Sequence, residues 1–131
     1  PADLIHDQAR SRLYVTDKAG RRLQVVDTTT GTVSREFQFD AMPEQMAMAP
    51  DGTRLYVALL VREHSPYRWD EEQSGYIAEF GLDPLEKTGQ YAIGIDPYDL
   101  AVTDAGKLVV TSGSGQWTSI HAYAATTGQF L

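Results

Sequence analysis

Short apolar runs alternate with polar turns along the whole chain. The runs are rich in Val, Ile, Leu, Tyr and Phe, and the turns between them contain Gly, Pro, Asp and Thr. These two groups of residues are typical of β-strands and of the tight turns that connect them. No segment keeps apolar residues three and four positions apart over several turns, so the pattern predicts no helix. We therefore predict an all-β fold.

The pattern of runs occurs three times, with a period of about 42 residues. The repeats span residues 1–42, 43–96 and 97–131. Each repeat begins with a proline-led segment and continues with further runs of strand type. The second repeat is longer because it contains an insertion at residues 62–75, and the third ends just as its fourth run begins. The three repeats together form one predicted domain.

The strands of these repeats are predicted to be covered on both faces. Val25 is followed by Val26, and Val109 is followed by Val110. A sheet with one face in water would alternate apolar and polar residues more regularly. Four strands recurring about every 40 to 45 residues, in sheets stacked face to face, are typical of a β-propeller. The sequence thus predicts a β-propeller-like array of three four-stranded antiparallel blades, of which the last is incomplete.

Two repeats resemble the YVTN family of propeller repeats. Residues 12–17 read Arg-Leu-Tyr-Val-Thr-Asp, and residues 25–28 read Val-Val-Asp-Thr. Residues 49–58 match the same pattern, whereas the third repeat has Val109 in place of the tyrosine and Ala124 in place of the aspartate. The resemblance implies a propeller fold and a secreted or cell-surface bacterial protein. The same repeat occurs in surface-layer and secreted binding proteins, in lactonase-like enzymes and in redox proteins.

Three blades are fewer than the roughly four to eight of closed propellers. The first and last blades would therefore each expose an apolar face, which favours association. Two explanations remain open at this point. The chain is part of a larger propeller, or two copies assemble into a six-bladed ring. Self-association through the exposed blade faces is compatible with both.

Two loops are predicted to meet on one rim of the array. The loop between the second and third strands lies on the same rim in every blade, and residues 62–75 and 112–119 form this loop in neighbouring blades. Both tryptophans lie there, and loops on a rigid scaffold often carry function. Aromatic rings in these loops are suited to stacking on a sugar ring or a peptide. The candidate ligand-binding residues are Tyr67, Arg68, Trp69, Gln116 and Trp117. The alternative is structural, with Trp69 covering a blade edge and Trp117 packing between blades.

A second group of candidate residues lies at the start of the innermost strand of each blade. Asp3, Gln45 and Asp99 occupy equivalent positions in the three repeats. They are placed to ring the mouth of a central channel, where lactonase-like and quinoprotein-like propellers have their active sites. The alternative is that these side chains cap the strand starts by accepting hydrogen bonds from backbone amides.

Composition and missing motifs narrow the functional classes. The chain has no cysteine, which removes disulfides, cysteine-bound metals and thiol catalysis. Asp and Glu total 18 against 11 Lys and Arg, and a net charge of −7 argues against nucleic-acid binding. No apolar run approaches the roughly 18 residues of a membrane span.

No motif indicates a catalytic serine, a zinc protease or a phosphate-binding loop. We expect no catalytic residue, metal site or cofactor, and we interpret the acidic residues 70–72 as a solvated loop.

The sequence favours a non-catalytic binding or scaffold module. Its ligand, a glycan, a peptide or another protein, is expected on the rim formed by residues 62–75 and 112–119. The alternative is part of a propeller enzyme of lactonase-like or quinoprotein-like type, with its site at the central channel.

Overall fold

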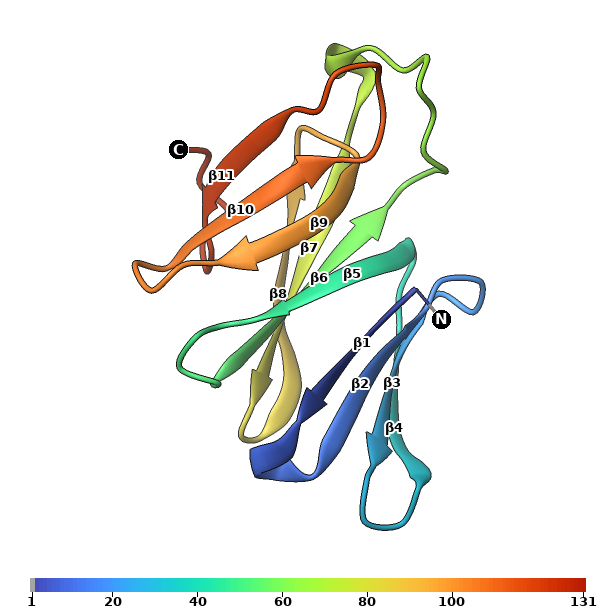
Figure 1. Cartoon of the computed structure of the whole chain (residues 1–131), viewed down its shortest axis with the longest axis vertical. Helices are drawn as coiled ribbons and strands as arrows, with labels where there is room; N and C mark the ends of the chain where they lie inside the picture. Colours follow the sequence, from blue (N-terminus) through green and yellow to red (C-terminus); the bar gives the residue numbers. More distant parts are fainter. Residues whose placement is uncertain (1) are drawn as a thin grey trace.

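The computed structural model describes residues 2–131; Pro1, with which the first predicted repeat begins, lies outside the described residues. The described chain is all-β, with eleven strands in three antiparallel sheets and two single-turn 3-10 helices. Figure 1 shows the three sheets arranged one after another, from the N-terminal sheet at the bottom to the C-terminal sheet at the top. The prediction of an all-β fold is confirmed. No helix in this part of the chain is long and apolar enough to cross a membrane.

The three sheets, which we call blades, follow one another along the chain, and the second begins at Met42, the last residue of the first predicted repeat. Blade 1 contains β1 (Asp3–Asp7), β2 (Arg12–Asp17), β3 (Arg22–Asp27) and β4 (Thr32–Gln38). Blade 2 contains β5 (Met42–Met48), β6 (Arg54–Leu60), β7 (Gly75–Leu82) and β8 (Leu85–Ile93). Blade 3 contains β9 (Pro97–Val102), β10 (Lys107–Ser112) and β11 (Ile120–Ala124). The helices are η1 (Gln8–Arg10) and η2 (Asp70–Glu72). In place of a fourth strand, blade 3 has a single bridge between Tyr123 and Phe130.

Glycines at equivalent positions close the turns between the first two strands of blades 2 and 3. Gly52 follows β5 with φ of +73°, and Gly106 follows β9 with φ of +75°. This left-handed conformation is strained for most residues but open to glycine. The repeated sequence therefore produces the same backbone turn twice.

The hydrophobic cores lie between the blades. Strand β6 contributes to both cores, because its alternate residues face opposite neighbours. Leu55 and Val57 pack toward blade 1, whereas Tyr56 and Ala58 pack toward blade 3. All four side chains are buried. The sequence analysis predicted that strands with apolar residues on both faces are stacked between neighbouring sheets. Strand β6 is the clearest example.

Phe80 of β7 fills the core between blades 1 and 2. Its ring meets Phe37 at a centroid distance of 4.9 Å and Phe39 at 6.0 Å, both in edge-to-face geometry. Phe80 is fully buried. Aromatic rings at these distances and angles add to the energy of apolar burial, so Phe80 is a main contact by which blade 1 stays attached to blade 2.

Tyrosines at equivalent positions in β2 and β6 bind buried carboxylates. The hydroxyl of Tyr14 donates to Asp7 Oδ2 at 2.7 Å, and that of Tyr56 donates to Glu79 Oε2 at 2.8 Å. Burial, together with the hydrogen bond to Asp7, raises the pKa of Tyr14 to about 12. Burial also raises the pKa of Tyr56, as does its bond to Glu79.

The stability of the fold is expected to fall at alkaline pH. In the unfolded chain tyrosine loses its proton near a pKa of about 10, whereas folded Tyr14 keeps its proton up to a pKa of about 12. Its contribution is therefore complete below about pH 10 and is lost as the pH rises through about 12. Urea unfolding measured across this range tests the expectation. The Tyr14→Phe variant should show a shallower fall, and an identical fall in both proteins would contradict this role of Tyr14.

Candidate ligand-binding rim

The β6–β7 and β10–β11 loops lie against each other on one rim of the array. The N–H of Gly115 donates to the carbonyl of Ser65 at 2.9 Å. The N–H of Ser65 in turn donates to Ser114 Oγ at 3.0 Å. These bonds join the loop of blade 2 to that of blade 3. The structure thus brings together the two segments that the strand order assigns to one rim.

A buried ion pair fixes the base of the longer loop. The carboxylate of Asp96 is 1% exposed, and it pairs with the guanidinium of Arg68. It also accepts the N–H of Ser74 at 3.1 Å. Arg68 reaches back across its own loop and donates to the carbonyl of Glu63 at 2.9 Å. A buried charge is tolerated when it is paired and hydrogen-bonded in this way, so the pair holds the β6–β7 loop in one conformation.

Gln73 links this ion pair to the loop of blade 3. Its Oε1 accepts the N–H of Asp96 at 3.1 Å and the hydroxyl of Ser112 at 2.6 Å. Its Nε2 donates to the carbonyl of Ser114 at 3.3 Å. Gln73, Ser112 and Ser114 are all buried. The sequence analysis missed this network, and the one available signal was a polar residue, Asp96, placed directly after an apolar run.

The two loops enclose a cleft of about 390 Å³. Tyr67, Trp69 and Trp117 line it and are 81%, 70% and 83% exposed. At this exposure Trp69 does not cover a blade edge, and Trp117 does not pack between blades. Large apolar side chains gathered on one exposed surface are typical of binding sites. The lining includes all five candidate residues, Tyr67, Arg68, Trp69, Gln116 and Trp117.

The charge of the cleft is negative. Asp70 and Glu71 contribute carboxylates to its lining. Asp70 accepts the hydroxyl of Ser119 at 3.2 Å, a bond that leaves its charge in place. Arg68 also lines the cleft, but its side chain is only 11% exposed because its guanidinium is turned toward Asp96. A ligand in the cleft would therefore meet aromatic rings and carboxylates, with the nearest positive charge already paired.

Asp3 and Asp99 make the capping contacts that were the structural alternative for the channel-mouth residues. Asp3 Oδ1 accepts the N–H of Leu4 at 2.8 Å, and Asp99 Oδ1 accepts the N–H of Leu100 at 2.9 Å. Gln45, at the equivalent position in blade 2, is half-buried. All three residues lie in the innermost strands, Asp3 at the start of β1, Gln45 within β5 and Asp99 within β9.

A second cleft, of about 620 Å³, lies at the N-terminal end of β5. Its lining includes Gln45, Tyr98 and an ionic group in which Lys18 Nζ lies 2.7 Å from Glu44 and 2.8 Å from Glu63. Burial acts to lower the pKa of Lys18, but its hydrogen bonds to the two carboxylates outweigh burial and raise it. The sequence analysis did not single out this group, because its members come from three separate segments.

His64 lies beside this ionic group. Its Nε2 is 3.4 Å from Glu44 Oε1, and its ring meets Tyr98 edge to face at 5.8 Å. The ring also lies directly over Gly113, where a Cβ atom would overlap it. Across residues 2–131, no three His, Asp or Glu side chains gather in an arrangement that could hold a metal ion.

Known structures share this architecture. Hydrazine synthase of Kuenenia stuttgartiensis superposes with a TM-score of 0.76 at 19% identity, over 100% of this chain and 34% of that one. The Cps50 (Swd1) β-propeller domain of Myceliophteria thermophila superposes with a TM-score of 0.69 at 12% identity, over 98% of this chain and 38% of that one.

These likenesses show the fold: the chain has the architecture of a β-propeller. It spans about a third of the length of the structures that it resembles. No family model matches the sequence, and no curated protein matches it either. The specific resemblance to YVTN repeats therefore stays a prediction.

Proposed function

We propose that this chain is a non-catalytic binding module that holds a glycan or a peptide in the cleft between the β6–β7 and β10–β11 loops. The observation that carries the proposal is the group of three highly exposed aromatic rings around one cleft. A scaffold of stacked blades beneath this rim supplies the rigidity that such a site needs. A secreted or cell-surface location in a bacterium is part of the proposal, and its support is the resemblance to YVTN repeats.

Rigidity of the loops supports binding over a purely structural role. The Asp96–Arg68 pair and the Gln73 bonds anchor both loops beneath the aromatic residues. A preorganised site binds more tightly because less conformational entropy is lost on association. Exposed aromatic side chains held on such a base resemble the aromatic anchors that dominate binding energy in protein interfaces.

The carboxylates narrow the class of ligand. Asp70 and Glu71 line the cleft, and the one arginine there is already paired with Asp96. Like charges placed together in an interface are costly. We therefore propose a neutral or amino-bearing glycan, or a peptide with basic side chains, rather than an anionic ligand.

Removing either tryptophan is expected to abolish most of the binding. Trp69→Ala and Trp117→Ala should each weaken affinity about 10- to 100-fold, the range of an aromatic anchor in an interface. Panels of immobilised glycans and of basic and acidic peptides identify the ligand, and titration of intrinsic tryptophan fluorescence measures its affinity. Both side chains are largely exposed, so far-UV circular dichroism should be unchanged.

Tyr98→Ala is the matched control for this experiment. Tyr98 is another exposed aromatic residue, but it lines the second cleft and not the first. It should leave binding intact. Binding that survives both tryptophan substitutions would contradict the proposal.

The second candidate function is part of a propeller enzyme with its site at the central channel. The second cleft favours it, because a lysine, two glutamates and a tyrosine meet near the innermost strands. Loss of ligand binding in Tyr98→Ala, with no effect of the tryptophan substitutions, would support this candidate over the first.

A further inference from the structure

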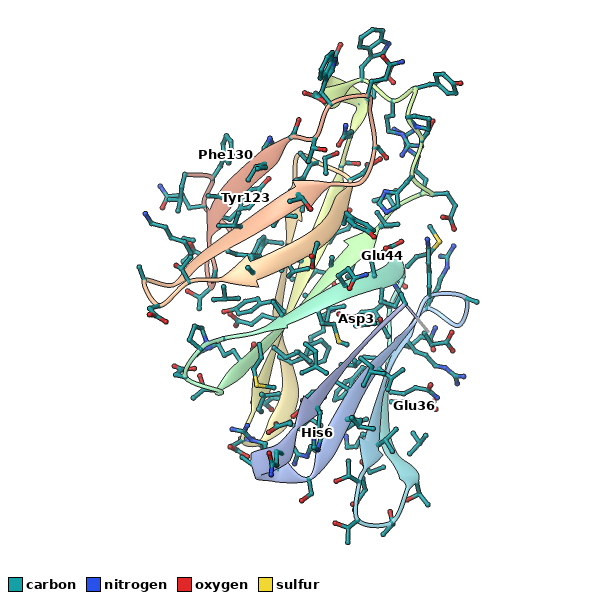
Figure 2. The ribbon with its side chains drawn as sticks, viewed as in Figure 1. Asp3, His6, Glu36, Glu44, Tyr123 and Phe130 are labelled. Carbon is teal, nitrogen blue, oxygen red and sulfur yellow. The ribbon has the colours of Figure 1, made fainter. Side chains whose placement is uncertain are left out.

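Two side chains of blade 1 bind the backbone of blade 2. Thr16 Oγ1 donates to the carbonyl of Glu44 at 2.8 Å, and Asp3 Oδ2 accepts the N–H of Met46 at 2.9 Å. Both bonds end on β5, the innermost strand of the next blade. Figure 2 shows Asp3 and Glu44 at this junction. We call Asp3 and Thr16 the inter-blade clamp.

The same clamp is assembled on blade 3. The N–H of Asp99 donates to Thr111 Oγ1 at 3.2 Å, as that of Asp3 donates to Thr16 Oγ1 at 2.9 Å. Asp99 Oδ1 also accepts the N–H of the next residue, Leu100, just as Asp3 Oδ1 accepts that of Leu4. Blade 3, however, has no following blade within residues 2–131. Asp99 and Thr111 therefore lie on the outer face of blade 3, in the arrangement that Asp3 and Thr16 have at the contact between blades 1 and 2.

An apolar contact of the same interface is also exposed on blade 3. Ile120 pairs with Thr111, just as Leu23 pairs with Thr16 in blade 1 and Ile77 pairs with Ala58 in blade 2. Leu23 and Ile77 are fully buried against the following blade, whereas Ile120 is 66% exposed. The outer face of blade 3 thus carries both the polar and the apolar parts of an unused blade contact.

Blade 1 exposes the complementary half. Leu4 pairs with Val15, as Met46 pairs with Val57 and Leu100 with Val110. Met46 and Leu100 are 5% and 8% exposed because each packs against the preceding blade, but Leu4 is 59% exposed. Met46 lies in one core cluster with Leu23, and Leu100 lies in one cluster with Ile77. By the same geometry, Leu4 fits against Ile120 of another molecule.

We propose that the outer face of blade 3 binds the outer face of blade 1 of a second copy of this chain, and that two copies close a ring of six blades. The second copy is the occupant because this chain itself presents the complementary face. Its Leu4 holds the position in β1 that corresponds to Met46 in β5. Six blades lie within the range of closed propellers, and a heterologous contact repeated twice closes a two-fold ring. The contact is separate from the proposed ligand cleft.

Light scattering over a wide concentration range tests the ring. The wild-type chain should have twice the mass of one chain. Ile120→Glu and Leu4→Glu each place a charge in the interface, and each variant alone should be monomeric. Both residues are exposed within one copy, so both variants should keep the circular dichroism of the wild type. Trp117→Glu is the matched control, because it charges an exposed apolar residue outside both faces and should remain dimeric.

Mixing the two variants distinguishes head-to-tail pairing from other modes. The Leu4→Glu chain keeps an intact blade 3, and the Ile120→Glu chain keeps an intact blade 1. Their mixture should therefore regain dimers through one intact interface. Thr111→Val, which removes only the clamp hydroxyl, should weaken dimerisation about 25- to 100-fold, because the ring contains this contact twice and each hydrogen bond accounts for about five- to tenfold.

Three outcomes would overturn the proposal. A monomeric wild-type chain excludes the ring. A Leu4→Glu variant that stays dimeric while Ile120→Glu does not would mean that blade 3 pairs with itself. A mass that keeps rising with concentration would show an open array rather than a closed pair of copies.

Discussion

Replacing Asp96 with alanine is expected to lower the free energy of unfolding by about 3–5 kcal/mol, the usual cost of removing one partner of a buried ion pair. The change leaves the guanidinium of Arg68, which is 11% exposed, without its counter-charge. It also removes the acceptor of the Ser74 N–H. Urea unfolding followed by circular dichroism measures the loss. The same variant should be cut faster by proteases in the β6–β7 loop, because the loop loses its anchor.

Asp83→Ala is the matched control for Asp96. Asp83 also pairs with an arginine, Arg10, at 2.6 Å, but its side chain is 70% exposed. Exposed pairs of this kind contribute little to stability, because water and salt screen their charges. Equal losses for the two variants would show that burial of the Asp96–Arg68 pair has no structural importance.

Phe80→Ala is expected to cost about 3–5 kcal/mol, because it opens a cavity in the core between blades 1 and 2. Phe80 is fully buried, and it holds Phe37 and Phe39 in edge-to-face contact. Denaturant unfolding measures the change.

Tyr76→Ala, on the same strand, is the comparison for Phe80. Tyr76 is 37% exposed, so its truncation should cost about 1 kcal/mol, the centre of the range for point substitutions. A Phe80→Ala loss no larger than that of Tyr76→Ala would mean that the blades do not depend on this aromatic contact.

The sequence alone was enough to predict the strands and their grouping into blades. The reason is local: residues 13–16 and 55–58 have the same pattern, and glycines such as Gly52 and Gly106 mark the same turn. Such signals involve neighbours in the chain, so one sequence contains them. The meeting of the two loops was also predictable, because it follows from strand order.

The buried network was not predictable from the sequence. Arg68 and Asp96 are 28 positions apart, and Gln73 and Ser112 are 39 positions apart. Their pairing depends on how two blades stack, and no local pattern encodes that distance. The exposure of Trp69 and Trp117 was also not predictable from the sequence, because it depends on whether a neighbouring surface covers them. For Asp3, the sequence analysis gave capping as one of two alternatives. It did not predict that Asp3 also accepts the N–H of Met46.

The clamp also bears on how such a chain can arise and diverge. Each of its bonds runs from a side chain of one blade to a backbone group of the next, and any residue offers a backbone carbonyl there, and any residue except proline a backbone N–H. A duplicated unit is therefore able to attach to its neighbour before the two sequences have adapted to each other. Blade 2 has Gln45 and Ala58 where blade 1 has Asp3 and Thr16, so its contact with blade 3 forms without the clamp side chains. Growth by gene duplication, followed by drift within individual units, is the history that this construction permits.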